Sequence, residues 1–312
     1  MIRAMPRESS PLRQMERFSF FVGLQLLLAA CSALDVPTAD REEGMLVLAS
    51  RSRDPNGRPS ERTLRWEARK TAVIIVDMWD DHWCKGAARR VGELAGPVND
   101  AVRELRGRGV LAIHAPSTTV KPYEGTPSRE RARRAPFRAT PAPLPTSERW
   151  GTAWCWPDPK RERVLPIDDS DMGCDCEKKC PIEPPWKRQI AAIEIRDEDA
   201  VSDDGQEVFN LLSERGIENV IVLGVHLNMC VLGRPFAIRQ QVALGKNVVL
   251  VRDLTDTMYN SQRPPGVDHF TGTDLVVEHV ERYWCPSILS SDLTGRAPFR
   301  FDEDRRPKRG ID

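Results

Sequence analysis

Five short apolar runs, separated by helical stretches, constrain the fold more than any other feature of this sequence. The first run, residues 71–76 (TAVIIV), is continuous and β-branched, as expected for a strand that is buried on both faces of a sheet. Strands that alternate with helices form a parallel sheet whose two faces are covered by those helices. We therefore predict a doubly wound α/β domain with strands at residues 71–76, 110–113, 190–195, 220–225 and 247–251.

Helical patterns fill most of the intervals between these runs. Gly107, Gly216 and Gly245 each follow a helical stretch and provide the signal that ends it. Ser202 stands where the second helix needs an N-cap. The predicted helices cover residues 98–106, 206–215, 230–244 and 273–283.

The stretch from about residue 115 to residue 188 interrupts this rhythm. It is rich in proline, tryptophan and cysteine, and Trp150, Trp154 and Trp156 argue against full disorder. We interpret it as a long insertion tied by disulfides, not as an independent domain. The main domain then covers residues 70–285, after a leader (1–31) and a polar linker (32–69), and before a flexible tail (286–312).

The N-terminal residues have the pattern of a secretory signal. Four arginines precede the apolar run 18–30, which is too short to span a bilayer comfortably. Residues 28–31 (LAAC) resemble a bacterial lipobox, in which the cysteine, here Cys31, becomes the lipidated first residue. We expect an exported protein of the bacterial periplasm or cell envelope, anchored through Cys31. An ordinary cleaved signal and a retained membrane helix are the alternatives.

The cysteine count supports an oxidising compartment. Cys31 is the expected lipidation site, and Cys230 is the candidate reactive thiol described below. The other six of the eight cysteines are an even number, which favours three disulfides. The sequence does not choose their pairing. A zinc site formed by Cys155, Cys174, Cys176 and Cys180 is the alternative. The six cysteines expected to pair are Cys84, Cys155, Cys174, Cys176, Cys180 and Cys285.

Polar and ionisable residues follow each apolar run, where an open parallel sheet places its ligand site. The most informative of them is Cys230, a thiol at the start of the helix after the fourth predicted strand. A helix N-terminus lowers the pKa of a thiol and offers backbone N–H groups to an oxyanion. Asp77, directly after the first run, is the best-placed acid/base partner. The other residues at these ends are His114, Arg196, His226, Arg252 and Asp253.

Two segments carry a resemblance to a known family. Residues 71–83 (TAVIIVDMWDDHW) and residues 224–231 (GVHLNMCV) resemble the first-strand and nucleophile motifs of the isochorismatase-like cysteine hydrolases, which include the nicotinamidases. The resemblance covers about residues 70–285, and it covers the insertion poorly. It implies a six-stranded, mostly parallel, Rossmann-like sheet with helices on both faces.

The resemblance also implies a triad of Asp, Lys and Cys. Asp77 and Cys230 match the family's Asp and Cys, so Cys230 would attack a carbonyl carbon and form a thioester while Asp77 moves the proton. The backbone N–H groups of Met229 and Cys230 would form the oxyanion hole, shaped by a cis peptide near Val225 and His226. We expect the pocket to be completed by Met229, His226, Val225, His114 and Trp79.

The sequence departs from the family at the lysine, whose place is held by Arg196. Arginine is always charged and cannot shuttle protons, although it can stabilise a thiolate. The Asp-x-His metal pattern of nicotinamidases is also missing after His114, so we expect no metal or cofactor. We predict a hydrolase of an amide C–N bond or a related small-molecule bond. A catalytically inactive binding protein on the same fold is the alternative, because the lysine is unmatched.

The charge balance narrows the expected partners. Lysine and arginine total 46, as do aspartate and glutamate, so the formal net charge is zero. A nucleic-acid partner would require a basic surface, which this composition does not favour. We expect a small-molecule substrate and membrane contact only through the lipid anchor, and the sequence leaves open a homo-oligomer.

Overall fold

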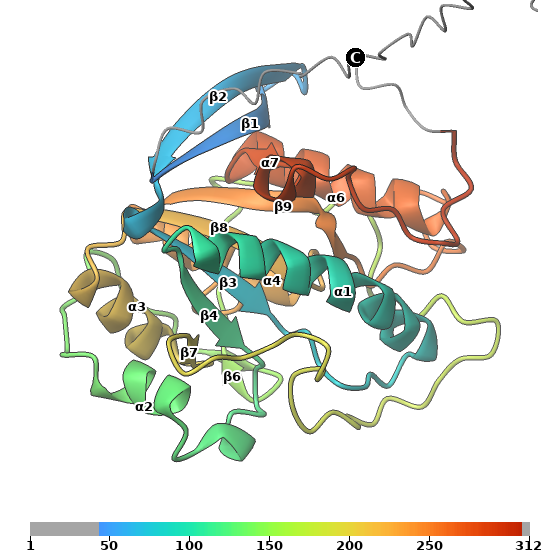
Figure 1. Cartoon of the computed structure of the whole chain (residues 1–312). Coiled ribbons are helices and arrows are strands. Elements are labelled where there is room, and N and C mark those ends of the chain that lie inside the picture. Colours follow the sequence, from blue (N-terminus) through green and yellow to red (C-terminus); the bar gives the residue numbers. More distant parts are fainter. Residues whose placement is uncertain (1–43, 308–312) are drawn as a thin grey trace, which may run out of the picture. The chain divides into compact units, whose positions relative to one another are not determined.

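The computed structural model describes residues 44–307, which contain a mixed eight-stranded sheet (Figure 1). The strand order is β2-β1-β10-β9-β8-β3-β4-β7. The six strands from β10 to β7 are parallel to their neighbours, and the antiparallel hairpin β1–β2 extends the β10 edge. The strands are β1 (Met45–Arg53), β2 (Pro59–Glu67), β3 (Thr71–Val76), β4 (Leu111–Ala115), β7 (Ala200–Val201), β8 (Asn219–Val225), β9 (Asn247–Asp256) and β10 (Ser287–Ile288).

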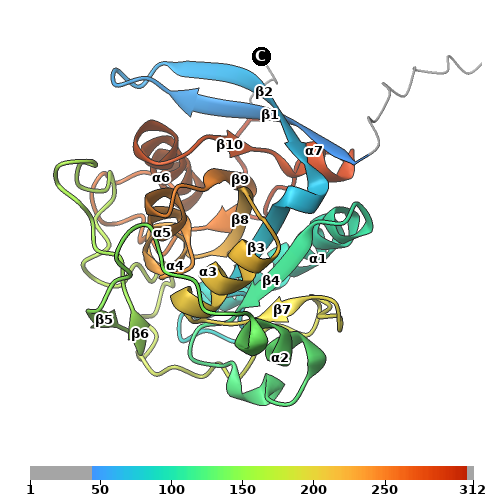
Figure 2. The same cartoon turned by 90° about the vertical axis from the view of Figure 1, so that its left-hand side faces the viewer.

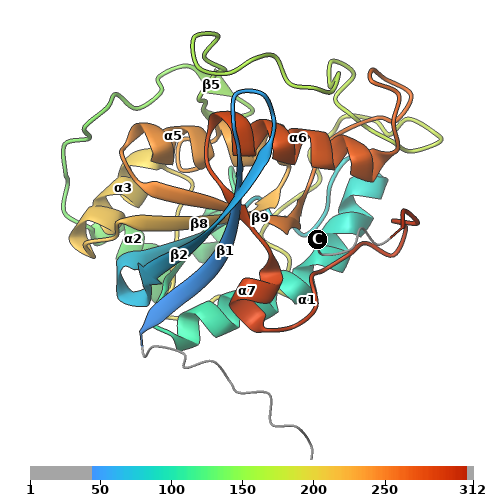
Figure 3. The ribbon, with the colours of Figure 1, turned by 90° about the horizontal axis from the view of Figure 1, so that it is seen from above.

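Helices cover both faces of this sheet, as predicted. Alternate side chains of β3 supply the two cores: Ile74 packs into the core under α3 to α6, and Ile75 packs into the core under α1 and α7. Figure 2 and Figure 3 show these two groups of helices on opposite sides of the strands. The helices are α1 (Lys85–Gly107), α2 (Pro127–Arg134), α3 (Gly205–Glu214), α4 (Cys230–Gly233), α5 (Ile238–Ala243), α6 (His269–Tyr283) and α7 (Ser290–Thr294), with short 3-10 turns η1 (Ala68–Lys70) and η2 (Lys121–Tyr123).

Three predictions about the sheet need correction. The sheet has eight strands and is mixed, because residues of the predicted polar linker form the hairpin β1–β2. The predicted strand at 190–195 is absent: Ala191 and Ala192 are exposed, and only Ile193 is buried, with Ile190 packed partly against the same core. The edge position falls to the two-residue β7 instead. Residues after 285, expected as a flexible tail, contain β10 and α7.

The predicted helix at 230–244 is divided into α4 and α5. Pro235 causes the break, because it lacks a backbone N–H and cannot continue a helix. The N-cap of α3 is Asp204, whose carboxylate accepts a hydrogen bond from the Glu207 amide at 2.8 Å, and not Ser202 as predicted. The break after α4 frees Arg234 from regular helix.

The insertion follows β4 along the side of α5 and α6 (Figure 3) and contains α2 and the small hairpin β5 (Glu148–Arg149) and β6 (Thr152–Ala153). The predicted disulfides are absent: all seven described cysteines are free, and the Sγ atoms of Cys84 and Cys176 lie 3.7 Å apart, against about 2.05 Å in a disulfide. Cys31 and the leader lie outside the described residues. Within residues 44–307, no helix combines the length and apolar character needed to cross a bilayer.

A buried carboxylate ties the insertion to the core where disulfides were expected. Glu162 accepts two hydrogen bonds from Arg239 of α5, at 2.8 and 2.9 Å, and lies 2.9 Å from Nε2 of His279 in α6. The indole N–H of Trp284 donates to the same carboxylate at 3.0 Å. Burial opposes ionisation, but the bonds from His279 and Arg239 outweigh it and lower the pKa of Glu162 to about 2.

We expect Glu162→Gln to destabilise the fold by about 3 kcal/mol at neutral pH, because the substitution leaves Arg239 buried without its counter-charge. The folded pKa lies below the ordinary value of 4.5, so the stabilisation is present above pH 4.5 and is lost as the pH falls towards about 2. Urea unfolding across this range measures it. The difference from wild type should shrink with acidification, and the exposed Glu148→Gln should show no such effect. A pH-independent difference would contradict the assignment.

Gly224 allows β8 to approach β3 closely near the end of both strands. Its φ is +107°, and a Cβ at this position would lie 2.2 Å from the Val76 carbonyl oxygen. The pairing of β8 with β9 also shifts register between Val222 and Gly224. Only glycine combines this φ with this contact.

Gly224→Ala should lower the free energy of unfolding by about 3 kcal/mol, because the added Cβ clashes with backbone that cannot move away. Chemical denaturation measures the change. Gly92→Ala is the matched control: Gly92 is exposed in α1, with no atom within 4 Å of the added Cβ, and should gain up to about 1 kcal/mol of stability. Equal stability of the two variants would refute the clash.

Candidate active site

The carboxyl ends of the neighbouring strands β3 and β8 bring Asp77 and Cys230 together. Asp77 directly follows β3, is fully buried and has a φ of +47°, a conformation that is uncommon for residues other than glycine. Its amide donates to the Ala115 carbonyl at 3.1 Å, and its Oδ1 accepts a hydrogen bond from the Ser117 amide at 2.7 Å. These bonds to the chain after β4 hold the carboxylate towards β8.

Cys230 begins α4, four residues after the cis peptide between Val225 and His226 that was predicted. The charges of the Asp77 carboxylate and the Arg234 guanidinium both act on its thiol. Burial and the negative charge of Asp77 raise the pKa of this thiol, and Arg234 opposes them only in part. α4 is a single turn of four residues, so it offers Cys230 a weaker helix N-terminus than the predicted helix at 230–244 would have done.

Arg234 supplies the cation of the site. Its Nε lies 3.3 Å from Oδ2 of Asp77, with both side chains at most 2% exposed. Its Nη1 contacts the hydroxyl of Thr152 and donates to the carbonyl oxygens of Arg149 and Trp150, at 3.4 and 3.5 Å. Burial opposes the charge of this guanidinium, but the thiol of Cys230 and the Asp77 carboxylate raise its pKa.

The structure does not place Arg196, predicted at the lysine position, in this site. Arg196 is exposed, and it pairs with Glu194 at 3.1 Å and with Glu198 at 3.9 Å. The error follows from the absent strand at 190–195, whose end would have pointed Arg196 at the sheet edge. The signal for Arg234 was its spacing, four residues after Cys230, which places two side chains on one side of a helical turn.

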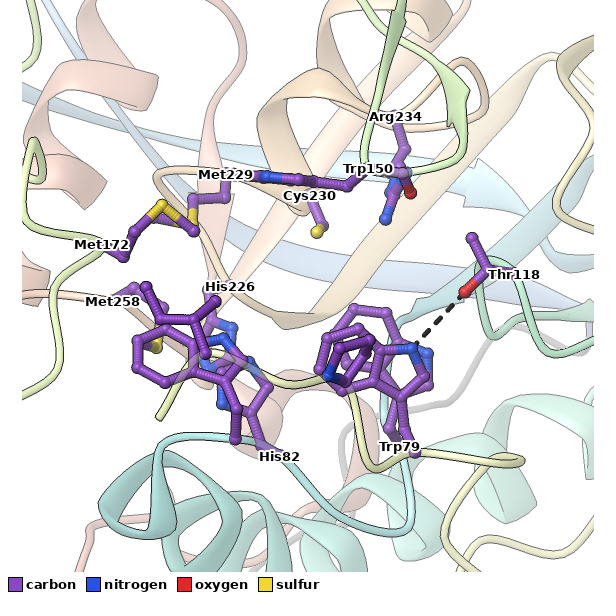
Figure 4. Close-up of a pocket in the computed structure, with 14 residues that line it drawn as sticks. Trp79, His82, Thr118, Trp150, Met172, His226, Met229, Cys230, Arg234 and Met258 are labelled. Atoms are coloured by element: carbon purple, nitrogen blue, oxygen red, sulfur yellow. Dashed lines mark hydrogen bonds between the residues drawn. The ribbon is translucent and has the colours of Figure 1, made fainter. Parts of the chain in front are cut away.

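A cavity of about 290 Å³ opens over the Cys230 sulfur. In Figure 4 the sulfur points into the space between Arg234, His226 and Trp79. Aromatic rings dominate one wall: the rings of Trp79 and Trp186 stack with centroids 4.5 Å apart, and His82 stacks on Trp186 at 5.4 Å. The lining residues are Trp79, His82, Trp83, Thr118, Trp150, Met172, Ile182, Pro184, Trp186, His226, Met229, Cys230, Arg234 and Met258.

The two histidines of this cavity are uncharged at neutral pH. Burial lowers the pKa of His82 to about 4, and burial together with the neighbouring His82 lowers the pKa of His226 far below its ordinary value. Among the described residues, none forms a hydrogen bond with the buried Nε2 of His226. His82 and Trp186 were not predicted as cavity residues, because neither lies at the end of an apolar run.

The remaining predicted pocket residues divide into two groups. Trp79, His226 and Met229 line the cavity. His114 and Val225 do not: His114 is fully buried against Gln189 (2.9 Å) and Asp199 (3.2 Å), and Val225 belongs to the core under α1. The Met229 amide, expected in the oxyanion hole, already donates to the His226 carbonyl at 3.0 Å.

The raised thiol pKa gives a prediction for alkylation. Asp77→Asn removes the charge that raises the pKa of Cys230, so this variant should react with iodoacetamide at pH 7 faster than wild type. Arg234→Met removes the opposing cation, so its alkylation should be slower. Peptide mapping by mass spectrometry isolates Cys230 from the other free cysteines. Unchanged or slower labelling of Asp77→Asn would contradict the charge assignment.

No protein-family model matches the sequence, and the search of curated proteins finds no match. Among solved structures, the chain is similar to a cysteine hydrolase from Pseudomonas syringae pv. phaseolicola 1448A, with 16% identity over 76% of this chain and 97% of that chain, at a TM-score of 0.46. It is also similar to an isochorismatase family protein from Burkholderia thailandensis, with 12% identity over 73% of this chain and 95% of that chain, at a TM-score of 0.40. A third similar structure is an isochorismatase family protein from Desulfovibrio vulgaris subsp. vulgaris str. Hildenborough, with 15% identity over 68% of this chain and 90% of that chain, at a TM-score of 0.36.

Proposed function

We propose that this chain is a cysteine hydrolase of the isochorismatase-like type that cleaves an amide C–N bond or a related small-molecule acyl bond. One observation carries the proposal: the Cys230 thiol lines an apolar cavity and feels the charges of a buried ion pair, Asp77 and Arg234, whose atoms Oδ2 and Nε lie 3.3 Å apart. Nucleophile, proton acceptor and cation are thus assembled in one place, as covalent acyl transfer requires.

In the first half of the reaction, Cys230 attacks the substrate carbonyl carbon. The S–H proton passes to the Asp77 carboxylate as the S–C bond forms, and the carbonyl electron pair moves onto oxygen. The Cys230 amide, at the first position of α4, has no acceptor within the helix and is available to the oxyanion. The C–N bond then breaks, and the leaving nitrogen takes the proton from Asp77, which leaves a thioester.

In the second half, water replaces the amine. Asp77 accepts a proton from the water while the water oxygen attacks the thioester carbon. The C–S bond then breaks and releases a carboxylic acid and the Cys230 thiolate. The proton held on Asp77 returns to sulfur. Arg234 cannot carry this proton, so its role is to stabilise the transient thiolate and the ionised carboxylate. The presence of this cation supports a hydrolase over the inactive binding-protein alternative, which was based on the unmatched lysine.

The walls of the cavity favour a flat, apolar acyl group. Stacked rings of Trp79 and Trp186 offer a planar face, and the sulfur atoms of Met172 and Met258 adapt to an aromatic partner. The buried, unpartnered Nε2 of His226 offers one polar contact in this apolar setting. An aromatic amide with one ring heteroatom or polar substituent matches these features.

We also propose that the protein acts outside the cytoplasm. The support is the sequence of residues 1–31, with its basic leader, apolar run and lipobox-like LAAC ending at Cys31. Membrane contact would come through that lipid anchor, and the substrate would be a small molecule.

Turnover of a panel of aryl and alkyl primary amides tests the catalytic assignment. Cys230→Ala and Asp77→Asn should each lower kcat by about 10³-fold or more, because each removes a group that forms or breaks a bond in the reaction. Arg234→Met should lower kcat less, and Arg234→Lys should restore part of the loss by keeping a cation beside Asp77.

Cys155→Ala is the matched control, since Cys155 is a partly buried free cysteine that does not line the cavity. Its turnover should equal that of wild type. Mass spectrometry of quenched reactions should detect an acyl adduct on Cys230. Equal turnover by wild type and Cys230→Ala would rule out the nucleophile.

A further inference from the structure

Three cysteines outside the proposed catalytic site converge where the insertion meets the start of α1. Cys84 is the N-cap residue of α1, and Cys174 and Cys176 belong to the insertion. Their Sγ atoms all lie within 4.8 Å of one another, and those of Cys84 and Cys176 are 3.7 Å apart. Cys84 and Cys174 are buried, and Cys176 is partly buried. Segments about ninety residues apart in the chain therefore place three sulfur atoms around one point.

The separation of these sulfurs fits metal coordination better than a covalent bond between them. Zinc binds thiolate sulfur at about 2.3 Å, so two sulfurs of a tetrahedral site lie about 3.8 Å apart. The 3.7 Å between Cys84 and Cys176 is close to that value and far above the about 2.05 Å of a disulfide. The third sulfur, on Cys174, lies within 4.8 Å of both, close enough to reach the same ion.

The surroundings supply positive potential for thiolates. The Gly86 amide donates a hydrogen bond to Sγ of Cys176 at 3.2 Å, at the N-terminus of a helix of 23 residues. A Cβ on Gly86 would meet that sulfur at 3.3 Å and Nη1 of Arg90 at 3.4 Å, so this guanidinium, whose Nε pairs with Asp256 at 2.7 Å, also lies beside the cluster. Nη2 of Arg90 is buried, with no hydrogen-bond partner among the described residues. Backbone N–H groups and a nearby cation are typical outer partners of metal-bound thiolates.

We propose that Cys84, Cys174 and Cys176 bind a zinc ion as thiolates, with the fourth position open to water or to an external ligand. Three soft sulfur ligands select a thiophilic ion over calcium or magnesium. Each thiol releases its proton to solvent on binding, and no oxidation or reduction is involved. The ligand set differs from the zinc alternative considered for the sequence, because neither Cys155 nor Cys180 belongs to this cluster.

A metal ion at this site would fix the position of residues that line the cavity over Cys230. Trp83, directly before Cys84, and Met172, two residues before Cys174, both line the cavity over Cys230. A metal ion that joins α1 to the insertion would therefore hold two walls of that cavity together. The inference does not depend on the proposed hydrolase activity, because the three cysteines are outside the group formed by Cys230, Asp77 and Arg234.

Metal analysis and cobalt substitution of the purified full-length chain test the site. Elemental analysis should find about one zinc per chain after dialysis. Co²⁺ added to the metal-free, reduced protein should produce sulfur-to-cobalt charge-transfer absorption in the near ultraviolet, together with the intense visible bands of tetrahedral cobalt. Both signals should saturate at about one equivalent of Co²⁺.

Cysteine-to-serine variants assign the ligands. Cys84→Ser, Cys174→Ser and Cys176→Ser should each weaken metal binding and reduce the charge-transfer absorption, whereas the controls Cys155→Ser and Cys285→Ser should leave both unchanged. Absence of cobalt bands in the reduced wild-type protein would overturn the proposal, and that measurement does not depend on any variant folding. A Cys84–Cys176 disulfide found in the unreduced protein by mass spectrometry would overturn it too. Loss of amide turnover alone bears only on the proposed function.

Discussion

The buried contact between Arg234 and Asp77 is the interaction on which the rest of the site depends. Two charges taken out of water each lose several kcal/mol of hydration, so they persist only when paired and hydrogen-bonded. The Asp77 carboxylate accepts a hydrogen bond from the Ser117 amide and pairs with the Arg234 guanidinium. The guanidinium in turn donates to the carbonyl oxygens of Arg149 and Trp150. Because the last two residues belong to the insertion, the charge pair is complete only when the insertion is seated on the domain. The insertion is therefore part of the charged site as well as a wall of the cavity.

The sheet brings these charges together through two local departures from regular structure. Asp77 leaves β3 in a left-handed conformation that turns its carboxylate towards β8, and Pro235 interrupts the helix after Cys230 so that Arg234 can turn back towards Asp77. Gly224 lets β8 lie close enough to β3 for the two loops to meet. Gly224 has the backbone freedom that its position requires, and Pro235 restricts the backbone so that a helix cannot continue.

These local causes explain how much of the structure could be predicted from the sequence. The strands β3 and β8 were predicted because each is a continuous apolar run, and Asp77 and Cys230 followed from their positions just beyond those runs. The segment 190–195 is also mostly apolar, but its two alanines are exposed and it forms no strand. Arg196 was assigned from that false strand. Arg234 and Glu162 could not be chosen from many other charged residues, because burial by distant segments, not local pattern, gives them their partners.

The raised pKa of Cys230 follows from the same charge balance. Asp77 already pairs with Arg234, so a thiolate would add a second negative charge beside that guanidinium. The low polarity of the walls makes that state costly. In the reaction we propose, the negative charge that forms as sulfur attacks moves onto the substrate carbonyl oxygen, and the thiol proton moves onto Asp77. Once the leaving group has taken that proton, the Asp77 carboxylate is ionised again and pairs with Arg234 as it does in the resting site.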